Sequence, residues 1–170
     1  MATLRKTMFG DIKQVMEIIE QGKSYLKSNG VDQWQNGYPN EAVIREDIGN
    51  GYGYVLADER NVVGTVALSF DGEPWYDDIQ DGQWLTNGRF LVIHRLAVSR
   101  TARGTALASE LIKHAEKLCL ERGVRSIKID THEDNIVMQR FVKKNGFKYC
   151  GTVILGSEGK RLAFEKVIKI

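Results

Sequence analysis

The chain has 170 residues, of which 42% are hydrophobic and 27% are charged, and its formal net charge is +2 at pH 7. This length and composition are typical of one soluble globular domain, which we expect to span residues 1–170. No apolar run is long enough to cross a membrane, and the first residues, MATLRKTMFGDIK, lack the apolar core of a signal peptide. We therefore expect a cytoplasmic location and no membrane partner. Cys119 and Cys150 fit neither a disulfide framework nor a metal-ligand spacing, so no metal is expected.

The two halves of the chain carry opposite charge. Residues 1–88 hold 7 Lys and Arg against 14 Asp and Glu, whereas residues 89–170 hold 17 against 8. This asymmetry indicates two ligands of opposite sign, and a surface charge without function is the alternative. The basic residues of the second half are spread around helices and are not interleaved with aromatic side chains, so a nucleic-acid partner is not expected.

The predicted elements follow one another as a strand, two helices, three strands, a helix, a strand, a helix and two strands. In chain order they are a strand at 4–7, helices at 11–26 and 40–48, strands at 52–57, 62–70 and 89–98, a helix at 103–122, a strand at 126–131, a helix at 134–145 and strands at 147–155 and 161–168. Asp11 and Asp134 are expected to cap their helices. The remaining long connection, residues 71–88, is turn-rich and acidic.

The most informative pattern is IHRLAVSRTARGTALASELIKHA, residues 93–115. An apolar strand ends at Val98, a loop with two arginines follows, and an amphipathic helix begins without an acidic side chain until Glu110. The unbonded backbone N–H groups and the dipole at a helix start favour anions. Small side chains from Gly104 to Ala108 allow a ligand to approach the backbone closely. The pattern therefore predicts a phosphate-binding site.

This stretch, together with NIVMQRFVKKNGF at 135–147 and the order of the elements, resembles the GNAT superfamily of acyl-CoA-dependent N-acyltransferases. The resemblance covers essentially the whole chain. It implies a mixed α/β fold in which about four helices flank a central, twisted, largely antiparallel sheet of six or seven strands. The family's phosphate loop, Arg/Gln-x-x-Gly-x-Gly/Ala, corresponds to the run that begins at Arg103. Ala106 replaces the middle glycine, which is tolerable if that residue has helical dihedral angles.

The resemblance implies that the chain binds acetyl-CoA as a co-substrate. The pyrophosphate would lie on the backbone amides of the loop, and the pantetheine arm would pair with the end of the preceding strand like an added strand. Asn135 would lie near the pantetheine and Lys143 near the nucleotide. The CoA contacts implied in this way are Leu96, Ala97, Val98, Arg103, Gly104, Thr105, Ala106, Leu107, Ala108, Asn135 and Lys143.

The resemblance also implies a mechanism in which an amine attacks the thioester carbonyl directly. The backbone N–H near Leu96 would stabilise the oxyanion. The proton of the attacking ammonium would pass to His94 or Glu73, directly or through water. His94 stands two residues before Leu96 in a strand, so we expect both side chains on one face. A histidine packed within the sheet is the alternative for His94.

The acid of the reaction departs from the family pattern. Many members have a tyrosine seven residues after the position of Asn135, and here that residue is Val142, which cannot protonate a thiolate. Tyr149, Tyr76 or water is left for this role, or the thiolate leaves unassisted. The missing tyrosine also supports an alternative function, a non-catalytic acyl-CoA-binding sensor.

The acceptor is expected to be a small or peptide-terminal cationic amine. Residues 69–84, SFDGEPWYDDIQDGQW, interleave carboxylates with aromatic rings and contain no lysine or arginine. Carboxylates beside aromatic faces suit a cationic amine, and a solvated acidic loop is the alternative. We expect Trp34, Trp75 and Tyr76 to contact this acceptor. A homodimer is left open.

Overall fold

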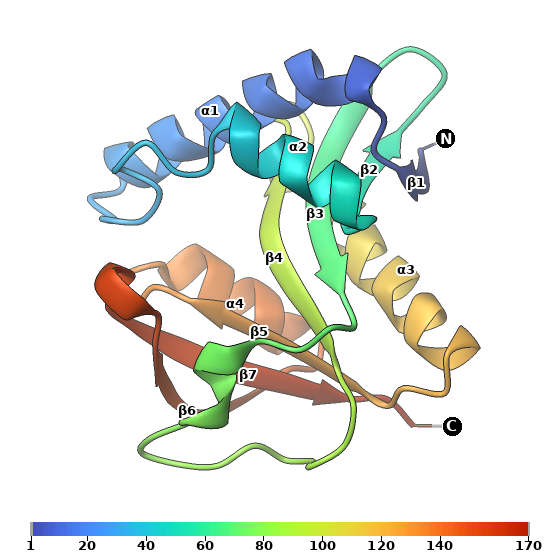
Figure 1. Ribbon diagram of the computed structural model, residues 1–170. Coiled ribbons are helices and arrows are strands. Elements are labelled where there is room, and N and C mark those ends of the chain that lie inside the picture. Colours follow the sequence, from blue (N-terminus) through green and yellow to red (C-terminus); the bar gives the residue numbers. More distant parts are fainter. Residues whose placement is uncertain (1, 170) are drawn as a thin grey trace. The chain divides into compact units, whose positions relative to one another are not determined.

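The computed structural model describes residues 2–169, which form seven strands and four α-helices in the predicted order (Figure 1). Their bounds are β1 (Thr3–Lys6), α1 (Ile12–Ser28), α2 (Glu41–Asn50), β2 (Gly53–Ala57), β3 (Val62–Ser69), β4 (Leu91–Val98), α3 (Leu107–Glu121), β5 (Ser126–Thr131), α4 (Ile136–Lys144), β6 (Lys148–Ile154) and β7 (Lys160–Val167). Three short 3-10 turns are η1 (Phe9–Asp11), η2 (Pro74–Asp77) and η3 (Gly156–Glu158). None of the helices in the described range is long and apolar enough to cross a membrane.

The strands are arranged in the order β1-β2-β3-β4-β5-β7-β6. The pairs β1/β2, β2/β3, β5/β7 and β6/β7 are antiparallel and β4/β5 is parallel, which confirms the largely antiparallel sheet. The register between β4 and β5 pairs Leu91 with Ile127 and Val92 with Lys128. In the described residues, the end of β4 from His94 onward therefore lies beyond its pairing with β5.

The residues cluster into two compact units, and β4 passes through both. Unit 1 comprises the described residues up to Leu68 together with His94–His114, and unit 2 comprises Ser69–Ile93 and the described residues from Ala115 onward. The single domain expected from the chain length stays a prediction.

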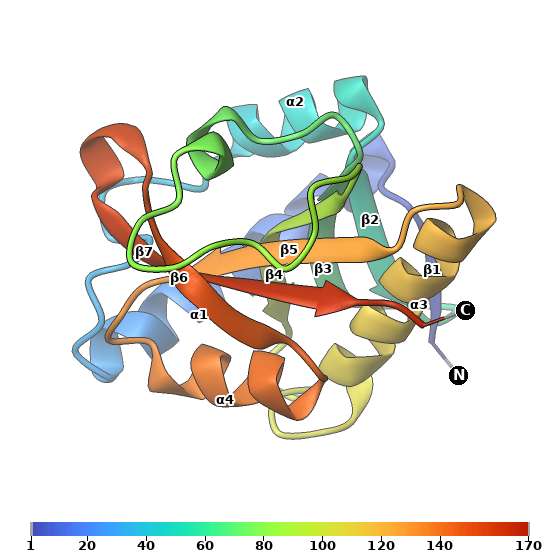
Figure 2. The ribbon, with the colours of Figure 1, turned by 90° about the horizontal axis from the view of Figure 1, so that it is seen from below.

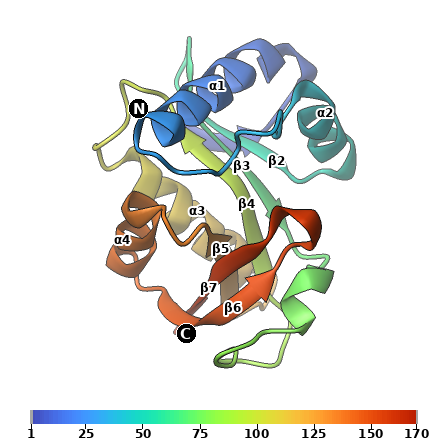
Figure 3. The ribbon, with the colours of Figure 1, turned by 90° about the vertical axis from the view of Figure 1, so that its left-hand side faces the viewer.

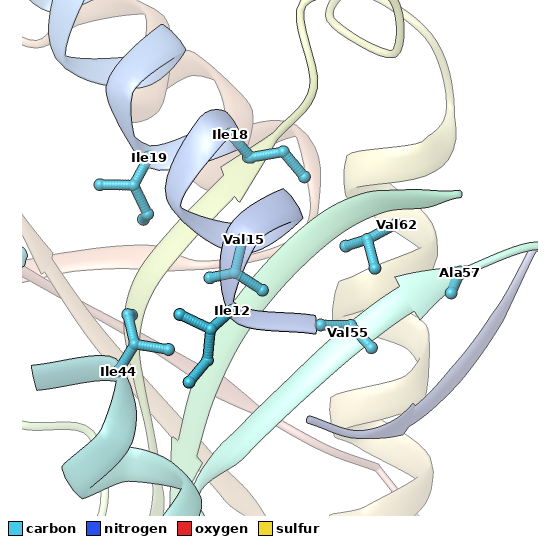
Figure 4. Close-up of a cluster of buried hydrophobic side chains, with 8 residues drawn as sticks. All are labelled: Ile12, Val15, Ile18, Ile19, Ile44, Val55, Ala57 and Val62. Atoms are coloured by element: carbon cyan, nitrogen blue, oxygen red, sulfur yellow. The ribbon is translucent and has the colours of Figure 1, made fainter. Parts of the chain in front are cut away.

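Unit 1 is built on a core between two helices and two strands. Figure 4 shows aliphatic side chains of α1 and α2 meeting those of β2 and β3, and each is at most 7% exposed: Ile12, Val15, Ile18, Ile19, Ile44, Val55, Ala57 and Val62. The 3- and 4-residue spacing along α1 places its four members on one stripe, as an amphipathic helix requires. Burying each large aliphatic side chain contributes roughly 1.5–3 kcal/mol. Ala97, near the end of β4, packs against this cluster, so the core holds that end of the strand.

In unit 2, both faces of the strands β5, β7 and β6 are covered by other segments of the unit. Figures 2 and 3 show α4 on one face and the segment that carries η2 on the other. That segment is bound to the strands by buried groups. Glu165, which is 0% exposed, accepts hydrogen bonds from the Leu85 N–H and the Thr86 hydroxyl. The ammonium of Lys128 lies 4.3 Å from the ring centre of Trp84, and burial lowers the pKa of this lysine.

Both of the helix caps that the sequence predicts, Asp11 and Asp134, are wrong. Asp11 makes no capping bond to α1; its carboxylate accepts hydrogen bonds from the guanidinium of Arg5, at 2.7 and 2.9 Å, and from the Met8 N–H at 2.8 Å. The cap of α4 is Asn135 and not Asp134, because the Asn135 side chain accepts from the Met138 N–H at 3.1 Å. A residue-type preference registers neither the bonds that hold the Asp11 carboxylate nor the one-residue shift of the cap of α4.

Candidate active site

Strand β4 contains one residue of unusual backbone conformation, Arg95, which directly precedes the predicted oxyanion donor Leu96. Arg95 has a backbone φ of +53°, in the left-handed region that residues other than glycine rarely enter. A left-handed residue inside a strand is typical of a β-bulge, which bends the strand and breaks the alternation of its side chains. The expectation that His94 and Leu96 share one face depended on that alternation and loses its basis. His94 is half-buried and Leu96 is buried.

The side chain of Arg95 is held by two residues of unit 1. Its guanidinium donates to both carboxylate oxygens of Asp47, at 2.8 and 2.5 Å, and to the hydroxyl of Tyr38 at 2.8 Å. Burial lowers the pKa of Arg95, but the hydrogen bonds to Asp47 and Tyr38 outweigh it and the pKa is raised. The guanidinium therefore stays charged in its buried position.

The loop after β4 presents a row of backbone N–H groups at the start of α3. The N–H groups that bond to protein acceptors are those of Arg100, Ala102, Arg103, Thr105, Leu107 and Glu110. Within the described range, five N–H groups in the same stretch donate to no protein acceptor: those of Thr101, Gly104, Ala106, Ala108 and Ser109. Clustered N–H groups at a helix start bind anions. The sequence placed its phosphate loop at the same residues.

The loop geometry accounts for the replacement of a glycine by Ala106. The left-handed turn lies at Gly104, with φ of +79°, and Ala106 is not among the residues with positive φ. The helix begins at Leu107 and not at Arg103 as expected, and the Thr105 hydroxyl accepts from the Leu107 N–H at 3.3 Å. The guanidinium of Arg103 stacks on the ring of Tyr25, 3.9 Å from its centre.

In unit 2, a buried tyrosine is bonded to a carboxylate. The hydroxyl of Tyr76 donates to Asp130 at 2.5 Å, and Tyr76 is 1% exposed. Burial, the charge of Asp130, this hydrogen bond and the charge of Glu73 together raise the pKa of Tyr76 well above its usual value. The phenol therefore stays protonated as a donor. Its ring is packed against Val92, Trp84 and other apolar neighbours. The acceptor contact expected at Tyr76 stays a prediction.

The predicted residues Glu73 and Trp75 lie beside this pair on the same segment. Glu73 is half-buried and its side chain accepts from the Trp75 N–H at 3.4 Å, which caps η2. The Trp75 side chain is 50% exposed and lies next to Gly156, where an added Cβ would be 3.3 Å from its ring. An exposed ring beside a carboxylate suits a cationic ligand.

Tyr149 lies on the other face of the strands. Asp130 pairs with Ala163, whereas Tyr149 pairs with Phe164, the next residue along β7. Because successive residues of a strand point to opposite faces, Tyr149 and Asp130 point to opposite faces of this part of the sheet. Tyr149 is 49% exposed and its ring contacts Phe164 edge-on. The structure therefore separates the predicted acid Tyr149 from the predicted base Glu73.

The other predicted residues belong to α4 and to the α1–α2 connection. Val142 is 0% exposed inside α4, and Lys143 is exposed in its last turn. Asn135 uses its side-chain oxygen to cap the helix. In unit 1, Trp34 packs on Gly22 and against the core cluster.

Two residues of these arrangements were missed at the level of sequence. Arg95 stands inside the apolar run of a strand, and Asp130 stands near the end of another strand. A charged residue within an apolar strand was the available signal for both. This signal does not identify the partner, because Asp47 lies 48 residues from Arg95 and Tyr76 lies 54 residues from Asp130 along the chain.

An open groove of about 840 Å³ lies elsewhere on unit 1. It is lined by residues of η1, α1 and the start of α2 together with Arg100, and it contains none of the predicted site residues. Lysine and arginine alternate with glutamate around it, so it has no net preference for ligand charge. In residues 2–169 no group of three or more His, Cys, Asp and Glu side chains could hold a metal ion.

Comparisons with known proteins agree with the fold. The sequence model of the acetyltransferase (GNAT) family matches residues 15–147. An acetyltransferase of the GNAT family from Streptococcus agalactiae 2603 is similar over 99% of this chain and 96% of its own, with 34% identity and a TM-score of 0.90. The PaiA N-acetyltransferase of Thermoplasma acidophilum, in complex with coenzyme A, shares the fold with a TM-score of 0.71 at 17% identity, over 98% of this chain and 99% of its own.

A curated relative points the same way. YesJ of Bacillus subtilis (strain 168), an uncharacterized N-acetyltransferase, is 21% identical over 151 residues, which are 85% of this chain and 80% of YesJ. The chain therefore belongs to the GNAT family of acetyltransferases and is an acetyl-CoA-dependent N-acetyltransferase.

Proposed function

We propose that this N-acetyltransferase acts on a primary amine that carries positive charge, either a small molecule or the amino end of a peptide. The observation that carries the proposal is the carboxylate of Asp130, which a buried tyrosine holds in a fixed orientation. Glu73 and the exposed ring of Trp75 belong to the same acidic segment. A fixed carboxylate forms a charge-assisted hydrogen bond with an ammonium group, so this surface favours cationic acceptors.

The donor contacts of the proposal belong mainly to unit 1. The unbonded N–H groups between Gly104 and Ser109 suit the pyrophosphate of acetyl-CoA, and their small side chains leave the backbone accessible. The end of β4 from Leu96 to Val98 lies beyond the pairing with β5, so its backbone suits an added strand such as the pantetheine arm. Asn135 and Lys143 stay predicted contacts. When bound, acetyl-CoA supplies the activated acetyl group as a thioester.

The chain itself supplies the groups that move protons. An ammonium ion must lose a proton before it becomes a nucleophile, and His94 or Glu73 accepts that proton, directly or through water. The N–H of Leu96 donates to the carbonyl oxygen as negative charge develops on it. Tyr149 is the remaining candidate for the general acid. The thiol of CoA is acidic enough that the thiolate can leave without a proton from a side chain. Replacing the Tyr149 hydroxyl is therefore expected to change turnover little.

A panel of amines tests the function. The panel holds polyamines, aminoglycosides, basic peptides and amino acids, with anionic amines such as glutamate as the contrasting class. Release of the CoA thiol and the mass of the acetylated product are measured for each. Turnover concentrated among the cationic members supports the proposal. Turnover of anionic amines alone would refute it, and binding of CoA without turnover of any amine would favour the sensor alternative. A cytoplasmic location and a homodimer stay predictions.

A further inference from the structure

We propose that Arg95 is a positioning residue for acetyl transfer: held by Asp47 and Tyr38, it keeps its own left-handed backbone conformation in β4 and thereby orients the N–H of Leu96 toward the thioester carbonyl. The inference rests on the oxyanion role proposed for Leu96. It adds the residues that set the geometry of this donor.

The backbone at Arg95 needs an external constraint. Among the described residues other than glycine, three have a positive φ, namely Trp34, Asp81 and Arg95, and of these Arg95 alone lies within a strand. A side chain in this conformation is strained, and such strain persists only where the surroundings determine the conformation. The constraint must therefore come from the contacts of Arg95 itself.

The guanidinium supplies that constraint through a rigid geometry. It forms two parallel hydrogen bonds with the carboxylate of Asp47, a residue of α2, and a third with Tyr38, in the connection before α2. The side chains of Arg95 and Asp47 are 15% and 8% exposed. A planar fork bonded at both prongs fixes orientation as well as position, and a lysine cannot reproduce it. The direction of the Arg95 side chain is therefore determined by elements outside β4.

The consequence falls on the next peptide group. The N–H of Leu96 belongs to the peptide that follows the Cα of Arg95, so the conformation at Arg95 sets its direction. In a β-bulge the extra residue is left out of the ladder, and bulges re-aim groups next to active sites. Here the left-handed residue Arg95 lies beyond the residues of β4 that pair with β5. The buried ion pair, which is weak evidence for stability, thus has a geometric role.

A purely structural role for Arg95 makes a different prediction. In that case, weakening the pair lowers stability and leaves the polarisation of a bound thioester unchanged. The two roles are separated by the infrared stretching frequency of the carbonyl in bound [1-13C]acetyl-CoA, which falls when an N–H donates to the oxygen. This measurement needs no acceptor amine.

The experiment compares the wild-type chain with Arg95→Lys, Tyr38→Phe and the control Arg45→Gln, which breaks an exposed pair with Glu41 on the same helix. In the wild type and the control we expect a carbonyl frequency below that of free acetyl-CoA. In Arg95→Lys we expect that shift to be lost, with the Kd for acetyl-CoA within about twofold of wild type because the loop amides are unchanged. Tyr38→Phe, which keeps the ion pair, should lose part of the shift. Thermal unfolding is recorded for all four.

The outcomes distinguish the inference from the function beneath it. A full carbonyl shift in both Arg95→Lys and Tyr38→Phe would overturn the positioning role and leave the proposed function standing. No shift in the wild type would instead refute the oxyanion role of Leu96. If Arg95→Lys does not fold, Tyr38→Phe decides the question alone.

Discussion

The hydroxyl of Tyr76 donates a hydrogen bond of 2.5 Å to the carboxylate of Asp130, 54 residues further along the chain. Tyr76 is 1% exposed, so water does not compete for this bond. The hydrogen bond therefore fixes the orientation of the Asp130 carboxylate on β5. It links the packed interior of unit 2 to the carboxylate that we propose binds the positive charge of the acceptor.

Tyr76→Phe should lower both stability and acceptor recognition. The substitution keeps the ring and removes the donor, so we expect the free energy of unfolding to fall by about 1–3 kcal/mol, as for a lost hydrogen bond to a charged group. Urea denaturation measures this. Tyr149→Phe is the matched control, since its hydroxyl belongs to a half-exposed ring, and should change stability by less than about 0.5 kcal/mol. Equal effects of the two substitutions would contradict the role of the Tyr76 hydroxyl.

Gly104→Ala should weaken acetyl-CoA binding. The residue has a φ of +79°, and a Cβ there costs roughly 1–2 kcal/mol. If that strain moves the unbonded amides, the Kd for acetyl-CoA rises by about five- to 25-fold, at 1.4 kcal/mol per factor of ten. Calorimetric titration measures the change. Gly123→Ala is the control, because Gly123 has a φ of +67° and, like Gly104, has nothing within 4 Å of an added Cβ. Equal weakening by both would show that the loop is not the anion site.

The ion pair of Arg5 and Asp11 should make the free energy of unfolding depend on pH in the acidic range. The hydrogen bond from Arg5 and that from Met8 hold the pKa of Asp11 below its ordinary value of 3.8, although burial opposes this. A carboxyl with a depressed folded-state pKa contributes stability above the unfolded value, and loses it as pH falls through the lower folded value. We therefore expect the stability difference between wild type and Asp11→Asn to be constant near neutral pH and to shrink below about pH 4. Denaturation curves at several pH values check this. A difference that grows on acidification would contradict it.

Both cysteines should resist alkylation in the folded chain. Burial raises the pKa of Cys119 to about 12 and also raises that of Cys150, and both side chains are buried. The thiolate is the reactive form, so at pH 8 iodoacetamide should label neither residue until the chain is denatured. Mass spectrometry of native and denatured samples tests this. Rapid labelling of native Cys119 would show that its site opens.

Most of the fold follows from local patterns in the sequence. Alternation, helical spacing and the glycine punctuation predicted β2, β5 and α2 within a residue or two of their bounds. The start of α3 lies four residues later than predicted, because residues 103–106 form a turn in which Gly104 has a φ of +79°. Residue preference leaves such a boundary open.

The candidate site was less predictable, because its key contacts are long-range. The predicted phosphate loop is contiguous in sequence, and unbonded amides lie among its residues. The partners of Arg95 and Asp130 come from distant segments, and the left-handed conformation of Arg95 removes the regular alternation from which the placement of His94 was inferred. Spacing along one chain cannot reveal such pairs, since tertiary packing brings them together.

The central claim is that Asp130 recognises a positive charge on the acceptor. The most direct test takes the fastest cationic amine of the panel and its analogue with a methyl group in place of the distal ammonium, such as 1,4-diaminobutane and 1-aminopentane. The kcat/KM of each is measured with wild type and Asp130→Asn. We predict that the wild type prefers the charged amine by about tenfold or more, as expected for one charge-assisted hydrogen bond, and that Asp130→Asn loses most of this preference at an unchanged KM for acetyl-CoA. Equal kcat/KM for the two amines in the wild type, or a preference that survives in Asp130→Asn, would contradict the claim.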